Sequence, residues 1–267
     1  MDLDGFAWGS RTLIVGILNV SPDSFAGDGL DDVEAAVARA ARMARCGADI
    51  IDIGGESTRP GFSAISADEE IRRVRPVVEL LASELGDTPI SVDTTKAAVA
   101  RAAFDAGASV LNDVHGLRGD PALADVAAAR DAWVIAMHNQ RGRPAADDPV
   151  ASVLDGFRAS LEIALAHGVR HERIILDPGF GFGWELAANA EILRRLSELR
   201  VLRSPILVGM SRKRMTGAQF GWGVEQRLEG SAAVTALAIA NGADLVRVHD
   251  VEAMSRVVQM ADDIVRR

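Results

Sequence analysis

Eight short apolar segments, each followed by polar residues, recur along the chain and constrain its fold more than any other feature. They are rich in Ile, Val and Leu without strict alternation, which is typical of strands covered on both faces. We expect strands near residues 13–18, 49–53, 89–93, 109–113, 133–137, 173–177, 205–209 and 244–248. In a parallel α/β barrel the functional residues lie at the carboxyl ends of the strands, where this chain carries its distinctive polar residues. The pattern therefore predicts an α/β fold, a (β/α)8 TIM barrel, with its site at one face.

A repeated junction between Ala-rich segments and apolar runs supports alternating helices and strands. It reads CGADI at 46–50, AGASV at 106–110 and NGADL at 241–245, with HGVRHERI at 167–174 as a looser copy. Glycine suits the left-handed residue that ends a helix, and the next residues enter a strand. The alternative, an open doubly wound sheet, would carry a GxGxxG turn after the first strand, where this chain has ILNVSPDSF. A short N-terminal extension, with FAWG at 6–9, is expected to close the lower end of the barrel.

Length and composition fit one domain over residues 1–267 and argue against several classes of protein. A barrel of this kind needs about 250 residues, and no linker or low-complexity segment divides the chain. The net charge of −9 argues against a nucleic-acid partner, although the field at a site can differ from the net charge. The single cysteine, Cys46, allows no intrachain disulfide. Without a signal peptide or an apolar segment of about 20 residues, we expect a cytoplasmic protein with no membrane partner.

Asp93, Asn112 and Asp177 end three different predicted strands and are expected to converge on one central pocket. Two carboxylates and an amide suit a flat heterocycle with several N–H donors, such as an aminopyrimidinone edge. Each residue alone could instead cap the following helix. The convergence of all three favours the ligand-binding interpretation.

Basic residues after other strands form a second group. Arg59, Arg247 and His249 could present N–H donors to a diphosphate, with arginine able to bind in bidentate fashion. An unpaired surface arginine is the alternative for Arg59, whereas an unpaired charge at Arg247, on a strand, would be costly. Lys213 can reach over the pocket and donate to ring heteroatoms, or be a solvated surface lysine. Asn19 offers a hard amide oxygen suited to magnesium.

The chain resembles the dihydropteroate synthase family over nearly its whole length, from Gly16 to Asp250. The resemblance rests on GILNVSPDSF, DIGGESTRPG, SVDT, NDV, MH, DPGFGFG, SRK and RVHD, which occur in the family's order at successive strand ends. It implies the same barrel and an enzyme, a transferase of folate biosynthesis. The implied reaction condenses 6-hydroxymethyl-7,8-dihydropterin diphosphate with p-aminobenzoate to 7,8-dihydropteroate and pyrophosphate, with Mg²⁺ assisting. It also implies a homodimer formed through helices of the last barrel units.

The same resemblance implies a role for each matching residue. Asp93, Asp177, Lys213 and Arg59 are expected to be catalytic. The pterin is expected to contact Asp93, Asn112, Met137, Asp177 and Lys213, although Met137 could also be an ordinary core residue. The diphosphate is expected to contact Asn19, Thr58, Arg59, Arg247 and His249, with Asn19 also binding the metal. The p-aminobenzoate pocket is expected to contain Phe25, Thr58, Pro60, Phe182 and Arg214, built by loops at 21–29 and 57–66 that order together.

Several departures from the family pattern concern the loops more than the pterin pocket. The chain reads AGDG at 26–29 instead of SDGG. HNQRGRP at 138–144 departs from the common HMQGxP by the substitution at Asn139 and by one extra residue. Trp184 replaces a frequent Lys, and Arg214 a frequent Ser. Two alternative functions stay open: a pterin-binding paralogue without activity, and a pterin-dependent methyltransferase. The methyltransferase would have no need of ESTRPG and SRK–RVHD around a diphosphate, and usually works beside a corrinoid-carrying domain.

Overall fold

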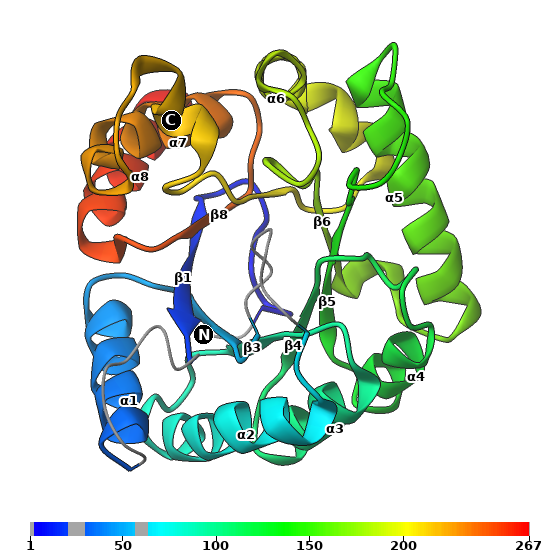
Figure 1. The fold of residues 1–267 in the computed structure, drawn as a ribbon, viewed down its shortest axis with the longest axis vertical. Coiled ribbons are helices and arrows are strands. Elements are labelled where there is room, and N and C mark those ends of the chain that lie inside the picture. Colours follow the sequence, from blue (N-terminus) through cyan, green and yellow to red (C-terminus); the bar gives the residue numbers. More distant parts are fainter. Residues whose placement is uncertain (1–2, 21–29, 57–63, 267) are drawn as a thin grey trace.

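A computed structural model describes residues 3–20, 30–56 and 64–266. Its strands all run parallel and form the inner wall of a barrel (Figure 1). They are β1 (Leu13–Asn19), β2 (Ile50–Gly54), β3 (Ile90–Asp93), β4 (Val110–Asp113), β5 (Trp133–Met137), β6 (Ile174–Asp177), β7 (Leu207–Val208) and β8 (Leu245–Val248). Seven strands lie within a few residues of their predicted positions, and β7 is shorter than expected.

The helices form an outer ring around these strands (Figure 1). They are α1 (Leu30–Arg45), α2 (Ala67–Glu84), α3 (Ala97–Asp105), α4 (Ala122–Ala129), α5 (Pro149–Ala166), α6 (Leu186–Arg194), α7 (Leu228–Ala240) and α8 (Val251–Val265). Short 3₁₀ helices add η2 (His171–Arg173), η3 (Leu196–Leu202), η4 (Arg214–Thr216), η5 (Ala218–Phe220) and η6 (Val224–Gln226). Within the described ranges, no helix has the length and apolar character needed to cross a bilayer.

The strand order closes the barrel and excludes the open doubly wound sheet. Neighbours follow the order β6-β5-β4-β3-β2-β1-β8-β7, and a parallel bridge between Leu176 and Ile206 joins the two ends. The Leu176 amide also donates to the Pro205 carbonyl at 2.9 Å. The predicted (β/α)8 barrel is therefore confirmed.

Alternating side chains along each strand divide the core in two, as the two-residue period of a strand requires. One buried cluster fills the barrel and includes Ile50 and Leu245. The larger cluster lies between strands and helices and includes Ile51 and Val246. Parity along a strand therefore decides whether a side chain points into the barrel.

The N-terminal extension packs on the barrel's interior, as the sequence predicts. Leu3 is buried in the inner cluster, and Phe6 and Trp8 pack against it. The indole of Trp133, at the start of β5, donates to Asp4 at 3.0 Å. This end of the barrel is thus filled by side chains, and the opposite end carries the polar residues.

The repeated glycine junctions adopt the backbone that their sequence predicts. Gly47, Gly107, Gly168 and Gly242 have φ of 105°, 117°, 88° and 99°, so each occupies a conformation that other residues rarely adopt. Each follows the helix of its unit and sets the direction of entry into the next strand.

Candidate active site

Strand parity directs one set of polar side chains into the carboxyl end of the barrel. Asp52 stands two residues after the inward Ile50, and Arg247 two residues after the inward Leu245. The register pairs Gly54 with Asp93, Asp93 with Asn112, and Met137 with Asp177. Inward-facing residues of six different strands thus form one layer at this end.

Arg247 bridges two carboxylates in this layer. Its Nε donates to Asp52 Oδ2 at 2.6 Å, and a terminal nitrogen donates to Asp93 Oδ2 at 2.8 Å. Asn112 Nδ2 donates to the same Asp52 oxygen at 3.0 Å. The other Asp52 oxygen is buried and has no hydrogen-bond partner among the described residues. Arg247 therefore lies among the acidic residues predicted for the heterocycle.

The charges of this network depend on one another. Burial raises the pKa of Asp93 to about 7, because desolvation and the nearby Asp52 outweigh the attraction of Arg247. Burial also opposes the charge of Arg247, but Asp52 and Asp93 more than compensate and raise its pKa. Asp93 thus holds its proton more tightly than an exposed carboxylate, whereas Arg247 stays charged.

Asp177, Lys213 and Arg247 surround Gly209, which follows β7. A Cβ atom on Gly209 would lie 3.7 Å from Arg247 Cβ, 3.8 Å from Asp177 Oδ2 and 4.0 Å from Lys213 Nζ. Burial raises the pKa of Asp177, against the opposing effect of Lys213, and lowers the pKa of Lys213 to about 8. Lys213 Nζ donates to the Phe180 carbonyl at 2.6 Å. Its ammonium therefore faces into the site instead of solvent.

The DPG turn after β6 fixes Asp177 through a glycine that no other residue can replace without strain. Gly179 has φ of 72° and donates its N–H to Asp177 Oδ1 at 2.8 Å. A Cβ atom there would lie 1.9 Å from the His138 carbonyl oxygen. The turn is therefore packed directly on the backbone that follows β5.

We expect Gly179→Ala to lower the free energy of unfolding by about 2–5 kcal/mol, from left-handed strain and the clash together. Gly142→Ala is the matched control, because Gly142 has φ of 73° but no atom within 4 Å of its Cβ position. It should lose only about 1–2 kcal/mol. Chemical denaturation measures both values, and equal losses would contradict the proposed clash.

Apolar side chains line the site beside Lys213. Met137, Val114 and Phe182 form a separate small buried cluster. Lys213 Nζ lies 4.6 Å from the centre of the Phe182 ring, and Arg141 Cζ lies 4.3 Å from it. An aromatic group could pack here within reach of two cations.

The remaining described candidates lie around the rim. Asn19 Oδ1 and Asp93 Oδ2 lie 3.7 and 3.9 Å from the Cβ position of Gly54, so both face the same point. His249 contacts Ser211, with its ring Nδ1 3.1 Å from the serine Oγ. The structure thus places His249 and Arg247 in different hydrogen-bond networks. Arg214, at the start of η4, is exposed.

A groove of about 570 Å³ beside His249 has a partly basic lining. Arg39 and Arg42 of α1 and Arg256 of α8 contribute to it, with Glu252 bonded to Arg42 at 3.0 Å. Asp250 also lines the groove, so its three arginines face two carboxylates, Asp250 and Glu252.

Phe25, Thr58, Arg59 and Pro60 lie outside the described residues. The residues on either side of 57–63 are described, and a hydrogen bond connects them. Glu56 Oε1 accepts from the Ile65 amide at 2.7 Å. Lys96 Nζ donates to Glu56 at 2.8 Å and to the fully buried Glu70 of α2 at 2.6 Å. This network fixes Glu56 and Ile65 to the barrel.

Asp52 is the main site residue for which the sequence predicted no role. It is fully buried and bonded to both Arg247 and Asn112. The signal was present: a carboxylate between isoleucines in a buried strand requires a charged partner. The sequence likewise predicted no role for Arg141, which stands in the loop at 138–144 that departs from the family pattern.

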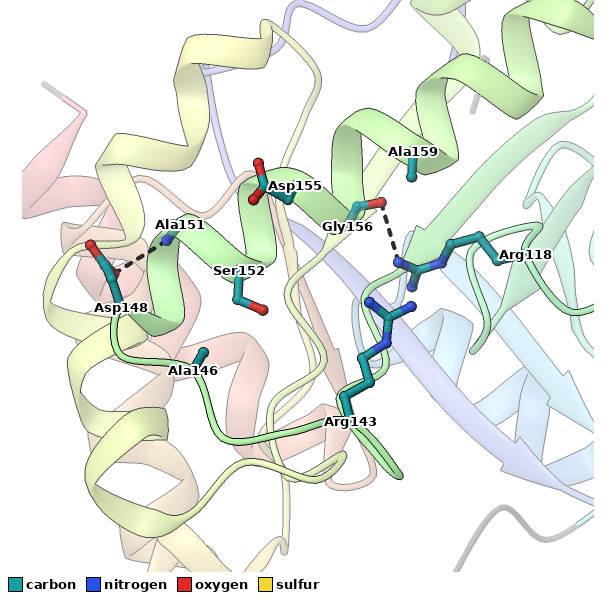
Figure 2. A pocket seen from close by; sticks show the side chains of 9 residues that line it. All are labelled: Arg118, Arg143, Ala146, Asp148, Ala151, Ser152, Asp155, Gly156 and Ala159. Atoms are coloured by element: carbon teal, nitrogen blue, oxygen red, sulfur yellow. Dashed lines mark hydrogen bonds between the residues drawn. The ribbon is translucent and has the colours of Figure 1, made fainter.

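A second pocket, of about 460 Å³, lies outside the barrel against α5. Figure 2 shows Arg118 and Arg143 directed toward each other at its edge. Arg118 donates to the Gly156 carbonyl at 3.4 Å and to the Met137 carbonyl at 3.3 Å. Met137 is the last residue of β5, so Arg118 joins the edge of this pocket to the barrel wall.

Comparisons with known proteins agree with this geometry. The family of pterin binding enzymes matches residues 15–249. A dihydropteroate synthase of Clostridium beijerinckii is 44% identical over 264 residues, covering 98% of this chain and 97% of that protein. A solved dihydropteroate synthase of Clostridium difficile, in the presence of pteroic acid, has a TM-score of 0.94 at 49% identity and covers 98% of this chain and 100% of its own. That of Xanthomonas albilineans with 4-aminobenzoic acid has a TM-score of 0.90 at 44% identity, covering 96% and 94%. The chain therefore belongs to the pterin-binding enzymes and, within them, to the dihydropteroate synthases.

Proposed function

We propose that this enzyme condenses 6-hydroxymethyl-7,8-dihydropterin diphosphate with p-aminobenzoate, giving 7,8-dihydropteroate and pyrophosphate. The observation that carries the proposal is the continuous set of contacts from Asn112 through Asp52 and Arg247 to Asp93. Asp177 and Lys213 adjoin it around Gly209. Solved relatives with pteroic acid and with 4-aminobenzoic acid support the two substrate classes.

The pterin binds in the layer formed by the inward polar residues. Asp93, Asn112 and Asp177 accept hydrogen bonds from its N–H edge, and Lys213 donates to a ring heteroatom. Met137 packs against the flat ring. Arg247, held by Asp52 and Asp93, supplies a fixed positive charge beside the bound substrate.

The reaction breaks the bond between the pterin's exocyclic methylene carbon and the diphosphate oxygen. The electron pair leaves with pyrophosphate, and the positive charge that develops on the dihydropterin is stabilised by Asp93 and Asp177. Arg59, Thr58, Arg247 and His249 stabilise the departing pyrophosphate. The arylamine nitrogen then bonds to the methylene carbon and releases a proton to solvent.

Magnesium is proposed to arrive with the diphosphate and to bind Asn19. The described residues contain no group of three or more His, Cys, Asp or Glu that could hold a metal ion by themselves. An amide oxygen facing the same point as Asp93 fits an ion whose other ligands are phosphate oxygens and water. When bound, the ion would neutralise charge on the leaving group.

The second substrate is proposed to pack on Phe182, with Phe25, Thr58 and Pro60 completing the pocket. Arg214 is proposed to approach the carboxylate of p-aminobenzoate.

Trp184, one of the departures from the family pattern, stacks on His138 at 5.5 Å and donates to the Pro178 carbonyl at 3.2 Å. It therefore supports the DPG turn.

Pyrophosphate release with and without p-aminobenzoate tests the function. A synthase should release pyrophosphate that depends on p-aminobenzoate and equals the dihydropteroate formed. A pterin-binding paralogue without activity would release none under either condition. A methyltransferase would release none and would require a methyl donor.

The pKa values of the site predict a narrow pH optimum. Asp93 must be ionised, so kcat/KM should fall as pH drops below about 7. Lys213 must be protonated, so kcat/KM should fall as pH rises above about 8. Initial rates across the pH range test this, and Lys213→Arg should remove the basic limb. A profile that stays flat from about pH 6 to about pH 9 would contradict these roles.

We further propose a homodimer formed through α7 and α8. These helices expose large apolar side chains, with Leu237 53%, Met260 62% and Ile264 71% accessible. Burying such side chains is the usual basis of a stable self-contact. Sedimentation equilibrium would measure the assembly.

A cytoplasmic location stays a prediction from the sequence, which cell fractionation tests.

A further inference from the structure

The loop after β5 places a cation on the aromatic wall of the site. Gln140 donates its backbone N–H to the Phe182 carbonyl at 3.0 Å, and Arg141 donates its backbone N–H to Asn139 Oδ1 at 3.1 Å. The Cβ position of Gly183 lies only 2.5 Å from the Arg141 nitrogen. The backbones after β5 and β6 are therefore packed together, and this contact fixes where the Arg141 side chain begins.

Arg141 and Lys213 contact the same aromatic ring but differ in depth. Arg141 Cζ and Lys213 Nζ lie 4.3 and 4.6 Å from the centre of Phe182. Arg141 is an exposed residue, whereas Lys213 extends inward toward Asp177. The wall of the site thus has one cation at its inner end and another at its mouth.

We propose that Arg141, in addition to Arg214, binds the carboxylate of the arylamine substrate and so sets specificity for it. The inference rests on the proposed function, because it concerns the same site. A flat arylamine packed on Phe182 must direct its amine inward, toward the pterin methylene. Its carboxylate then points outward, where water remains available and a guanidinium can bind it in bidentate fashion.

The chemistry of the ligand follows from this arrangement. A planar arylamine with an anionic group opposite its amine fits this site, because its amine reaches the pterin methylene inside and its anionic group reaches Arg141 at the mouth. A neutral arylamine of the same shape would keep the packing on Phe182 but lose the charge attraction. Arg141 therefore favours anionic over neutral arylamines and takes no part in bond breaking.

Steady-state kinetics of Arg141→Ala with p-aminobenzoate and with its neutral analogue 4-aminobenzamide tests the proposal. We expect KM for p-aminobenzoate to rise about tenfold, which corresponds to about 1.4 kcal/mol, with kcat and the KM of the pterin substrate little changed. The affinity for 4-aminobenzamide, measured as KM or as an inhibition constant, should stay the same. Arg141→Lys should restore part of the preference for the anion.

Arg143→Ala is the matched control. It removes the same charge from the same loop, but Arg143 lies at the outer pocket with Arg118 (Figure 2). It should leave both affinities unchanged. The proposal is overturned if Arg141→Ala keeps the wild-type preference for p-aminobenzoate over the amide, or if Arg143→Ala loses it equally. Failure of the proposed function would look different, because wild type itself would then release no pyrophosphate with p-aminobenzoate.

Discussion

Asp177→Asn should lower kcat by about 10²–10³-fold, the largest loss of activity expected from an isosteric change in this protein. The carboxylate is buried, and in the proposed reaction it stabilises positive charge that develops on the dihydropterin. An asparagine can keep the hydrogen bond from the Gly179 N–H, so the DPG turn should survive. Steady-state pyrophosphate release measures the loss, and a denaturation curve checks the fold.

Asp244→Asn is the control for this variant. Asp244 is also buried and ion-paired, but it precedes β8 at the opposite end of the barrel and accepts from the Ile206 N–H at 3.0 Å. Its replacement should reduce stability and leave kcat within about twofold of wild type. If Asp177→Asn also stayed within a few-fold of wild type, the carboxylate role would be wrong.

Arg247→Met should produce the largest loss of stability, about 3–5 kcal/mol near pH 8. The variant leaves Asp52 and Asp93 buried without their shared cation. Arg247 lowers the pKa of Asp93, so its removal must raise that pKa above about 7. A carboxyl group whose pKa is raised on folding favours the folded state at low pH and loses that contribution as pH rises through the raised value. The stability difference from wild type should therefore shrink as pH falls from 8 toward 5.

Arg200→Met serves as the matched control for Arg247→Met. Arg200 pairs with the buried Asp244 at 3.2 Å, but its own side chain is 48% exposed. Water can replace much of that pairing, so we expect a loss below about 1 kcal/mol with little pH dependence over the same range. Chemical denaturation at several pH values measures both variants. A deficit for Arg247→Met that grows toward low pH would contradict the proposed charge network.

The sequence predicted the barrel because each strand end carries its own chemical signature. The glycine junctions located the helix ends, and period-two alternation brought Asp93, Asn112 and Asp177 into one layer. Strand β7 was shorter than predicted: Ile206 forms only an isolated bridge and Gly209 lies beyond the strand. Apolar character alone does not show where pairing stops.

The sequence could not predict which side chains in the site form hydrogen bonds and ion pairs with one another. Arg247 and His249 stand two positions apart in RVHD and were both expected to bind diphosphate. In the structure Arg247 bonds to Asp52 and Asp93, because an inward arginine in a buried layer requires carboxylates, whereas His249 contacts Ser211. Arg141 was also unpredictable, since its position over Phe182 depends on packing between two loops.

A crystal structure with bound 6-hydroxymethyl-7,8-dihydropterin would test the central claim most directly. We predict that the pterin's N–H edge lies within hydrogen-bond distance of both Asn112 and Asp177, with Lys213 Nζ moved from the Phe180 carbonyl to a ring heteroatom. A pterin bound at the outer pocket beside Arg118, or no pterin between β3 and β6, would contradict the account.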